Sequence, residues 1–231
     1  MRVWVTRAEP GASRTAARLR ELGHEPVVDP VLEVRPMEAA IDLDGVAAIA
    51  FTSTNGVEAF AARAVERALP VFTVGDATAE AALAAGFENV SSADGDAEAL
   101  GRLLSGAGLP EGSTVLHPGG RDRAADLGGA VSPRLIVRSL ALYETVEREP
   151  LAAATATDSL DAVLVHSPKA ARRIAALATA FAPTVRWLTL SQAVAAPLIG
   201  AGFTLVTASA RPNEAALLAL LADAGPNPEA R

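Results

Sequence analysis

The stretch AAIAFTSTNGVEAF, residues 47–60, shows how this chain is organised. An apolar run ends at the small polar residues Thr52–Asn55, and an alanine-rich helical pattern follows directly. This order is typical of a buried strand that enters a helix through a polar turn. Ligands of open α/β sheets bind at the carboxyl ends of the strands. We therefore expect a functional edge here, where side-chain oxygens adjoin the unpaired N–H groups of a helix.

A second copy of this pattern, AVLVHSPKA, occupies residues 162–170. Three further pairs of segments match at offsets of 111 to 117 residues: Ala84–Phe87 with Gly200–Phe203, Ala97–Leu100 with Glu214–Leu217, and Val5–Arg7 with Leu116–Pro118. Strand and helix patterns alternate along almost the whole chain, which predicts parallel sheets with helices on both faces. The sequence thus predicts an α/β protein of two similar, flavodoxin-like domains, with a ligand cleft between them.

The composition restricts the chemistry. A chain of 231 residues can form one large domain or two of about 100–120 residues each. It contains no cysteine, which excludes disulfides, thiolate metal sites and a cysteine nucleophile. His24, His117 and His166 lie far apart in the sequence without HxxxH spacing, so we expect no metal site.

The charge and the length of the apolar runs argue against two classes of partner. The net charge of −7 and the pI of about 5.0 argue against nucleic acid. No apolar run reaches the roughly 18 to 20 residues that span a bilayer. The strand pattern of residues 1–6 leaves no room for a signal peptide. We therefore expect a cytoplasmic protein without a membrane partner, and a monomer.

Five polar turns are expected at strand carboxyl ends, each opening a helix: Thr6-Arg7, Ser53-Thr54-Asn55, Gly75-Asp76-Ala77-Thr78, Pro118-Gly119-Gly120-Arg121 and Ser167-Pro168-Lys169. A helix N-terminus favours an anion by about 0.3–1 kcal/mol, so several such turns would suit a ligand with many carboxylates or phosphates. The alternative is that the Ser, Thr and Asn side chains only cap their own helices.

Several predicted element bounds matter for these turns. The helix after Ser53 is predicted to run to about Ala68, and a helix is predicted from about Ala124. Two separate strands are expected around Leu135–Val137 and over Leu140–Val146.

Other catalytic and cofactor motifs find no support. The segment Gly75–Ala82 is too short and too poor in glycine for a dinucleotide fingerprint, and Gly119-Gly120 lacks the Lys-Ser/Thr of a P-loop. We therefore expect no nucleotide cofactor. No Ser-His-Asp arrangement can be defended, and His117 and His166 are interpreted as strand-end residues satisfied by local hydrogen bonds.

Tyr143 is the single tyrosine of the chain and stands in an extended segment between the repeats. A phenol is a neutral hydrogen-bond donor at pH 7, and a positioned donor could protonate a departing hydroxyl group. The alternative is a packed aromatic ring whose hydroxyl lies in water.

These features together resemble the uroporphyrinogen-III synthase family over essentially the whole chain. The resemblance rests on the order and spacing of six motifs: Phe51–Ser53, Val74–Ala79, Leu116–Gly120, Leu142–Val146, Val165–Pro168 and Gly202–Phe203. It implies a cofactor-free lyase that closes the linear tetrapyrrole hydroxymethylbilane, with inversion of the last ring and loss of water.

The resemblance also implies roles for particular residues. Tyr143 matches the tyrosine expected to assist loss of the hydroxyl group, and Ser53, Thr78 and Ser167 match hydroxyls that line the family's cleft. The substrate carries eight carboxylates, which gives the polar turns a purpose as their receivers. Ser191 and Gln192 stand where family members commonly have a glycine followed by hydroxyl residues, and they can still hydrogen-bond a carboxylate.

Family members pass from one domain to the other and back. By that pattern residues 1–33 join residues 147–231 in one discontinuous domain, and residues 37–142 form the second. Two hinge strands, near residues 33–37 and 142–147, connect them. The proline-flanked, extended character of Val31–Pro36 agrees with a hinge there.

Two other functions stay open at this point. A non-catalytic ligand-binding or regulatory module on the same fold would carry an appended signalling domain, and the sequence contains none. A phosphate-sugar or nucleotide enzyme would need a glycine-rich phosphate loop, which is also missing.

Overall fold

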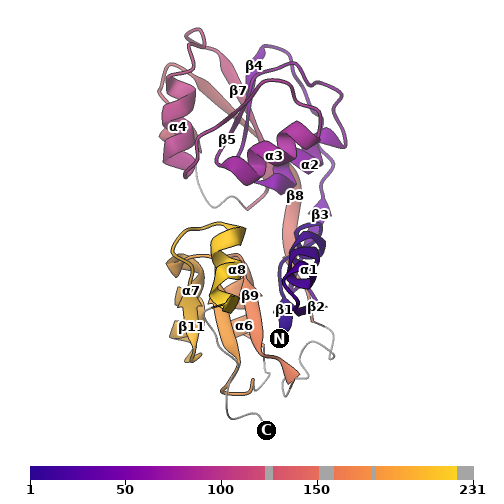
Figure 1. Ribbon diagram of the computed structural model, residues 1–231. Coiled ribbons are helices and arrows are strands. Elements are labelled where there is room, and N and C mark those ends of the chain that lie inside the picture. The colour runs from indigo at the N-terminus through magenta and orange to yellow at the C-terminus, as the bar shows by residue number, and fades with distance from the viewer. Residues whose placement is uncertain (123–126, 151–158, 178–180, 223–231) are drawn as a thin grey trace. The chain divides into compact units, whose positions relative to one another are not determined.

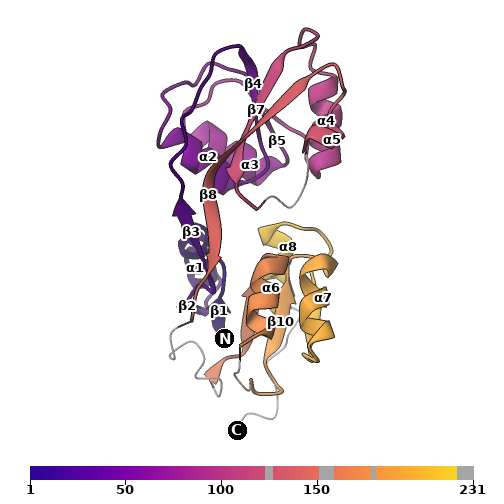
Figure 2. The ribbon, with the colours of Figure 1, turned by 180° about the vertical axis from the view of Figure 1, so that it is seen from behind.

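The computed structural model describes residues 1–122, 127–150, 159–177 and 181–222 (Figures 1 and 2). Contacts between residues divide the chain into two units. Met1–Val34 and Val146–Arg231 form the first, which we call the terminal unit, and Arg35–Thr145 form the second, which we call the middle unit.

The terminal unit contains a five-stranded parallel sheet in the order β11-β10-β9-β1-β2. Its strands are β1 (Arg2–Val5), β2 (Glu25–Val28), β9 (Ala162–Val165), β10 (Arg186–Thr189) and β11 (Val206–Ala208). Its helices are α1 (Gly11–Glu21), α6 (Pro168–Ala175), α7 (Gln192–Gly200) and α8 (Glu214–Ala222).

Helices cover both faces of this sheet. Val3 and Leu164 pack on the face covered by α1 and α8, whereas their neighbours Trp4 and Val165 pack on the face covered by α6 and α7. Helices α6 and α7 are on the near side in Figure 2, and α1 and α8 on the near side in Figure 1. Because both faces are buried, the central strands are continuous apolar runs in the sequence.

The middle unit contains strands in the order β3-β8-β7-β4-β5-β6, and the pairs from β8 to β6 are parallel. The strands are β3 (Leu32–Pro36), β4 (Val46–Phe51), β5 (Val71–Thr73), β6 (Val90–Ser92), β7 (Thr114–Gly120) and β8 (Ile136–Glu147). The helices are α2 (Thr54–Ala61), α3 (Asp76–Ala84), α4 (Ala97–Ser105) and α5 (Leu127–Ala130).

This second sheet is also covered on both faces. Ile49 and Phe51 of β4 pack on the side of α2 and α3, where Phe51 joins Phe60 and Phe87 in an aromatic cluster. Ala48 and Ala50 pack on the side of α4 and α5. Figures 1 and 2 show α2 and α3 on the opposite side of the strands from α4.

Corresponding strands lie in the same order in the two sheets. From one edge, the orders are β6-β5-β4-β7-β8 and β11-β10-β9-β1-β2. The central strands β4 and β9 carry the repeated stretches 47–60 and 162–170. The prediction of an α/β fold with two similar parallel-sheet domains is confirmed.

The prediction that Pro118–Arg121 form a turn that opens a helix is wrong. Pro118, Gly119 and Gly120 continue β7 and pair with residues of β8. The two strands expected around residues 135–137 and 140–146 are one strand, β8. Backbone pairing with this long neighbour extends β7 and overrides the low strand propensity of proline and glycine. The helix start expected near residue 124 lies outside the described residues.

Two helices differ from their predicted bounds. Helix α2 ends at Ala61 rather than near Ala68. Arg67 explains this, because its guanidinium donates to the carbonyl oxygens of Ala61 and Ala64 and so satisfies groups that a longer helix would bond internally. The same guanidinium donates to the carbonyl oxygen of Ala85 at the end of α3. Thr6-Arg7 does not open a helix directly either. Helix α1 begins at Gly11, after a loop.

The predicted domain division, residues 1–33 with 147–231 and residues 37–142, stays a prediction about folding. The two units describe contacts, whereas domains that fold independently have to be tested by expressing the segments separately.

Two helical glycines predict opposite responses to alanine. A Cβ on Gly101 of α4 would overlap the carbonyl group of Ala130, which is backbone and cannot move aside easily. We expect Gly101→Ala to destabilise the protein by about 1–3 kcal/mol through overpacking. A Cβ on Gly200 of α7 would meet nothing within 4 Å. We expect Gly200→Ala to stabilise by about 0.5–1 kcal/mol, because alanine loses less entropy in a helix. Denaturant unfolding of both variants measures the difference, and equal effects would contradict the packing of α4 on α5.

Candidate functional site

At the carboxyl end of β4, two hydroxyl side chains have defined partners. Ser53 is the N-cap of α2, and its Oγ accepts a hydrogen bond from the backbone N–H of Gly56 at 3.1 Å. Thr52 Oγ1 lies 3.1 Å from Nε2 of His117, which is buried in β7. Thr54 and Asn55 follow as the first residues of α2 and are half-buried. The sequence prediction that these turn residues adjoin a helix N-terminus is therefore correct for β4.

Tyr143 lies at the same edge of the middle unit. Its side chain is buried, with 8% of the residue exposed, and its hydroxyl lies 3.1 Å from Ser53 Oγ. The pairing of β7 with β8 shifts between Gly119 and Gly120, so that Gly119 pairs with Ala141 but Gly120 pairs with Tyr143. Such a bulge changes the direction of the side chains that follow it.

Gly120 allows the tyrosine ring to lie against β7. A Cβ on Gly120 would come within 2.9 Å of Cε2 and 3.1 Å of Cζ of Tyr143. Gly119 is buried in the same strand. Arg121 is exposed, its backbone N–H donates to the Tyr143 carbonyl oxygen, and its guanidinium pairs with Glu144 at 2.7 Å. Gly120, which has no side chain, thus permits close approach of an aromatic ring to the backbone.

The turns that precede α3 and α7 share a construction that sequence reasoning missed. Thr73 Oγ1 donates to the carbonyl oxygen of Gly75, and Thr189 Oγ1 donates to that of Ser191. Both threonines are fully buried and stand 116 residues apart, as Gly86 and Gly202 do. The shared offset of 116 residues could have identified Thr73 and Thr189 as corresponding residues of the repeat.

Neither of these two helices is capped by the side chain at its N-cap position, Gly75 for α3 and Ser191 for α7. Asp76, Ala77 and Gln192 are exposed in the first turns. Thr78 is buried, and its N–H bonds to the carbonyl oxygen of Gly75. The first N–H groups of α3 and α7 are therefore not used by a cap of the kind that Ser53 provides to α2.

At the carboxyl ends of β1 and β9, two predicted residues have structural partners. Thr6 is fully buried, and its hydroxyl donates to the carbonyl oxygen of Leu164 at 2.7 Å, which joins β1 to β9. Ser167 caps α6 by accepting a hydrogen bond from Ala170 N–H at 3.2 Å. Pro168 begins that helix, and Lys169 beside it is half-buried.

A charged cluster that sequence reasoning missed lies at this edge of the terminal unit. Glu214, the first residue of α8, accepts hydrogen bonds from Thr15 at 2.6 Å and from Arg7 at 3.2 Å. His166 Nε2 lies 3.0 Å from the same carboxylate. In the sequence, Glu214 stood out only as the first residue of a repeated helix segment. No local pattern connects it with Arg7 and Thr15, which lie some 200 positions away.

The titration of the cluster follows from burial and its hydrogen bonds. Burial lowers the pKa of His166, although its bond to Glu214 acts in the other direction. A neutral His166 donates its Nε2–H to the carboxylate, which can only accept. For Glu214 burial raises the pKa, but the bonds from His166 and Thr15 and the charge of Arg7 outweigh burial and lower it to about 2.

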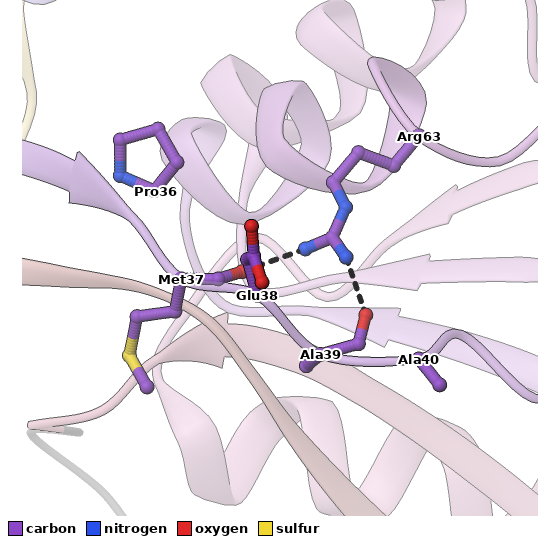
Figure 3. Close-up of a pocket in the computed structure, with 6 residues that line it drawn as sticks. All are labelled: Pro36, Met37, Glu38, Ala39, Ala40 and Arg63. Carbon is purple, nitrogen blue, oxygen red and sulfur yellow. Dashed lines mark hydrogen bonds between the residues drawn. The ribbon is translucent and has the colours of Figure 1, made fainter.

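The middle unit also has an open depression of about 750 Å³ (Figure 3). It is lined by Pro36, Met37, Glu38, Ala39, Ala40 and Arg63. The Arg63 guanidinium donates to the carbonyl oxygens of Met37 and Ala39, so it fastens the segment after β3 to the end of α2. None of the predicted site residues lines this depression.

Within the described ranges, no group of three or more His, Asp or Glu side chains could hold a metal ion. In the same part of the chain, every helix is too short or too polar to cross a bilayer.

The cluster around Glu214 predicts a pH-dependent effect on stability. A depressed carboxyl pKa contributes stability that is complete above about pH 4.5 and is lost as the pH falls toward 2. Glu214→Gln should therefore destabilise the protein at pH 7, by about 3 kcal/mol for a partly buried charge cluster. The gap to the unchanged protein should narrow between pH 4.5 and 2, as unfolding at several pH values would measure.

The matched control is Glu111→Gln, which removes an exposed ion pair with Arg134 and should change stability by less than about 1 kcal/mol. A gap that stays constant down to pH 2 would contradict the assignment of an ionised Glu214.

Comparisons with known proteins agree with these features. The family described as HEM4, uroporphyrinogen-III synthase HemD, matches residues 13–219. No curated protein matches the chain.

Solved structures show the same fold. Uroporphyrinogen-III synthetase from Helicobacter pylori 26695 is similar with 15% identity and a TM-score of 0.67, covering 96% of this chain and 98% of that one. A mutant uroporphyrinogen III synthase from the extremely thermophilic bacterium Thermus thermophilus is similar with 17% identity and a TM-score of 0.53, again covering 96% and 98%. Because the family match extends over nearly the whole length, this chain belongs to the uroporphyrinogen-III synthase family.

Proposed function

We propose that this protein closes hydroxymethylbilane to uroporphyrinogen III, with inversion of ring D and loss of water, in tetrapyrrole biosynthesis. The observation that carries the proposal is the family match over residues 13–219. The reaction is a cofactor-free carbon–oxygen lyase reaction. The bilane can close unaided to the wrong isomer, so the main task of the enzyme is to hold the substrate in one shape.

The substrate's carboxylates meet helix N-termini at the carboxyl edges of the sheets. The α3 and α7 turns are the best supported receivers, because Gly75 and Ser191 leave the first N–H groups without a side-chain cap. Each such terminus favours an anion by about 0.3–1 kcal/mol. Binding of the substrate carboxylates therefore does not require many lysine side chains, which agrees with a net charge of −7 for the chain.

Most of the other predicted receivers fall into two groups. Thr54, Asn55, Asp76, Ala77, Thr78, Pro168, Lys169 and Gln192 lie in the first turns of α2, α3, α6 and α7. Arg7 and Arg121 supply positive charge, each balanced by a carboxylate, Glu214 or Glu144. A substrate carboxylate would compete with those partners, so we expect these arginines to contribute less than the backbone N–H groups.

Tyr143 is the proton donor in this proposal. Its phenol is buried beside Ser53, so water competes little for its proton. The phenol proton moves to the hydroxymethyl oxygen, the carbon–oxygen bond breaks and water leaves, which generates an azafulvene. The terminal pyrrole then attacks the azafulvene through its substituted carbon and forms a spiro intermediate. This intermediate fragments and recloses as the III isomer. The terminal pyrrole loses a proton in the closure, and this proton restores the phenol.

The location and assembly are proposals of the same kind. We expect a cytoplasmic monomer, and light scattering of the purified protein would measure the assembly.

Isomer analysis tests the function. The purified protein is supplied with hydroxymethylbilane, and the I and III isomers are separated by chromatography after oxidation. We expect the III isomer to dominate. Accumulation of the I isomer alone, at the rate seen without protein, would reject the enzyme and leave a binding module.

Tyr143→Phe tests the proton donor. The variant keeps the ring against Gly120 but has no phenol proton to give. We expect kcat to fall by about 100-fold or more with a smaller change in KM, because the lost interaction acts in the transition state. Initial rates of III-isomer formation measure both constants, and unchanged turnover would remove Tyr143 from the mechanism.

A further inference from the structure

The hydroxyl group of Ser53 has two hydrogen-bonding neighbours. Its Oγ accepts the backbone N–H of Gly56 at 3.1 Å and lies 3.1 Å from the hydroxyl of Tyr143. A serine hydroxyl offers one proton and two lone pairs. One lone pair is used by Gly56, which leaves the Ser53 proton available for the phenol oxygen.

The backbone holds Ser53 in this position. A Cβ on Gly56 would come within 2.9 Å of the Pro118 carbonyl oxygen, so the first turn of α2 lies directly against β7. Tyr143 is held from the other side by Gly120 and by the bulge between β7 and β8. Two glycine contacts therefore set the distance between the two hydroxyls: Gly56 of α2 lies against β7, and Gly120 of β7 lies against the Tyr143 ring.

The corresponding serine of the terminal unit lacks this second contact. Ser167 caps α6 through Ala170 N–H, as Ser53 caps α2 through Gly56 N–H. The chain contains one tyrosine, so the phenol contact belongs to Ser53 alone. Helix capping explains what both serines do, and it does not explain why one of them meets a phenol.

We infer that Ser53 is a positioning residue for Tyr143 and not a receiver of a substrate carboxylate. Its hydroxyl donates a hydrogen bond to the phenol oxygen and stabilises the negative charge which that oxygen acquires when its proton leaves for the substrate. The inference rests on the proposed function for its kinetic consequence.

Two features strengthen this donation. The N–H of Gly56 polarises the hydroxyl, because hydrogen bonds in a chain reinforce one another. The N-terminus of α2 adds a partial positive charge beside the developing phenolate.

Substitutions of Ser53 separate capping from donation. Ser53→Asp keeps an acceptor for Gly56 N–H and for the phenol proton, but an ionised carboxylate has no proton to donate. Ser53→Thr keeps both functions. We expect Ser53→Thr to retain kcat within about twofold, and Ser53→Asp and Ser53→Ala to lower kcat by about tenfold or more with little change in KM, as for the loss of one hydrogen bond.

The matched control is Asp96→Ala. Asp96 caps α4 in the same unit through Ala99 N–H and has no role in the site. We expect this variant to lower the melting temperature as Ser53→Ala does, without changing kcat. Ser53→Asp should keep the melting temperature because the cap is preserved.

A signal from the single tyrosine tests the contact without any turnover. Protein labelled with carbon-13 at the tyrosine ζ carbon gives one resonance, which belongs to Tyr143. We expect Ser53→Ala to shift this resonance and Asp96→Ala to leave it in place.

Three outcomes would overturn the inference. These are an unmoved Tyr143 resonance in Ser53→Ala, a wild-type kcat in Ser53→Asp, or a raised KM with unchanged kcat in Ser53→Ala, which would make Ser53 a carboxylate receiver. Formation of the I isomer alone by the unchanged protein would reject the proposed function instead, and the resonance would still decide whether Ser53 contacts Tyr143.

Discussion

In each sheet, one central strand pairs in parallel with neighbours on both sides and is covered by helices on both faces. These strands are β4 and β9, and their register with β7, β5, β1 and β10 decides which side chains meet at the carboxyl edge. Side chains alternate between the two faces of a sheet, so the register of a strand also fixes the face on which the first residue after it lies. His166 thus comes next to Glu214 of α8, and Thr52 comes next to His117 of β7.

The carboxyl edges of the two sheets share the same serine and threonine hydrogen bonds but differ in the other side chains that they bring together. Ser53 and Ser167 cap the helices that follow the central strands, and Thr73 and Thr189 fix the turns that follow the neighbouring strands. The terminal unit adds a charged cluster around Glu214, which ties together α1, α8, β1 and β9. The middle unit adds Tyr143, whose phenol faces the serine cap. The charged cluster is thus particular to the terminal unit, and the contact between a phenol and a serine cap is particular to the middle unit.

The glycines of the middle unit show how a backbone prepares a site. Gly120 permits the tyrosine ring to lie on β7, and Gly56 permits α2 to approach Pro118. Neither glycine has a positive φ angle. Glycine is needed at these two positions because a Cβ would collide with the neighbouring atoms. The Gly119-Gly120 pair resembles a phosphate loop in composition only, and Gly120 serves the packing of an aromatic ring.

Sequence alone determined the alternation of strands and helices along most of the chain, the repeat and the presence of a single tyrosine, because each of these follows from local periodicity, matched offsets or composition. It left open whether Ser53 and Ser167 cap their helices, which the structure shows. It could not determine that β7 continues through Pro118–Gly120, since that extension depends on pairing with β8. Glu214 was missed for a related reason: its partners Arg7, Thr15 and His166 come from three other elements. Hydrogen bonds between distant segments exist only after the sheets have brought the carboxyl ends of their strands together. Tertiary structure therefore decided which polar residues are paired with one another and which helix N-termini have no side-chain cap.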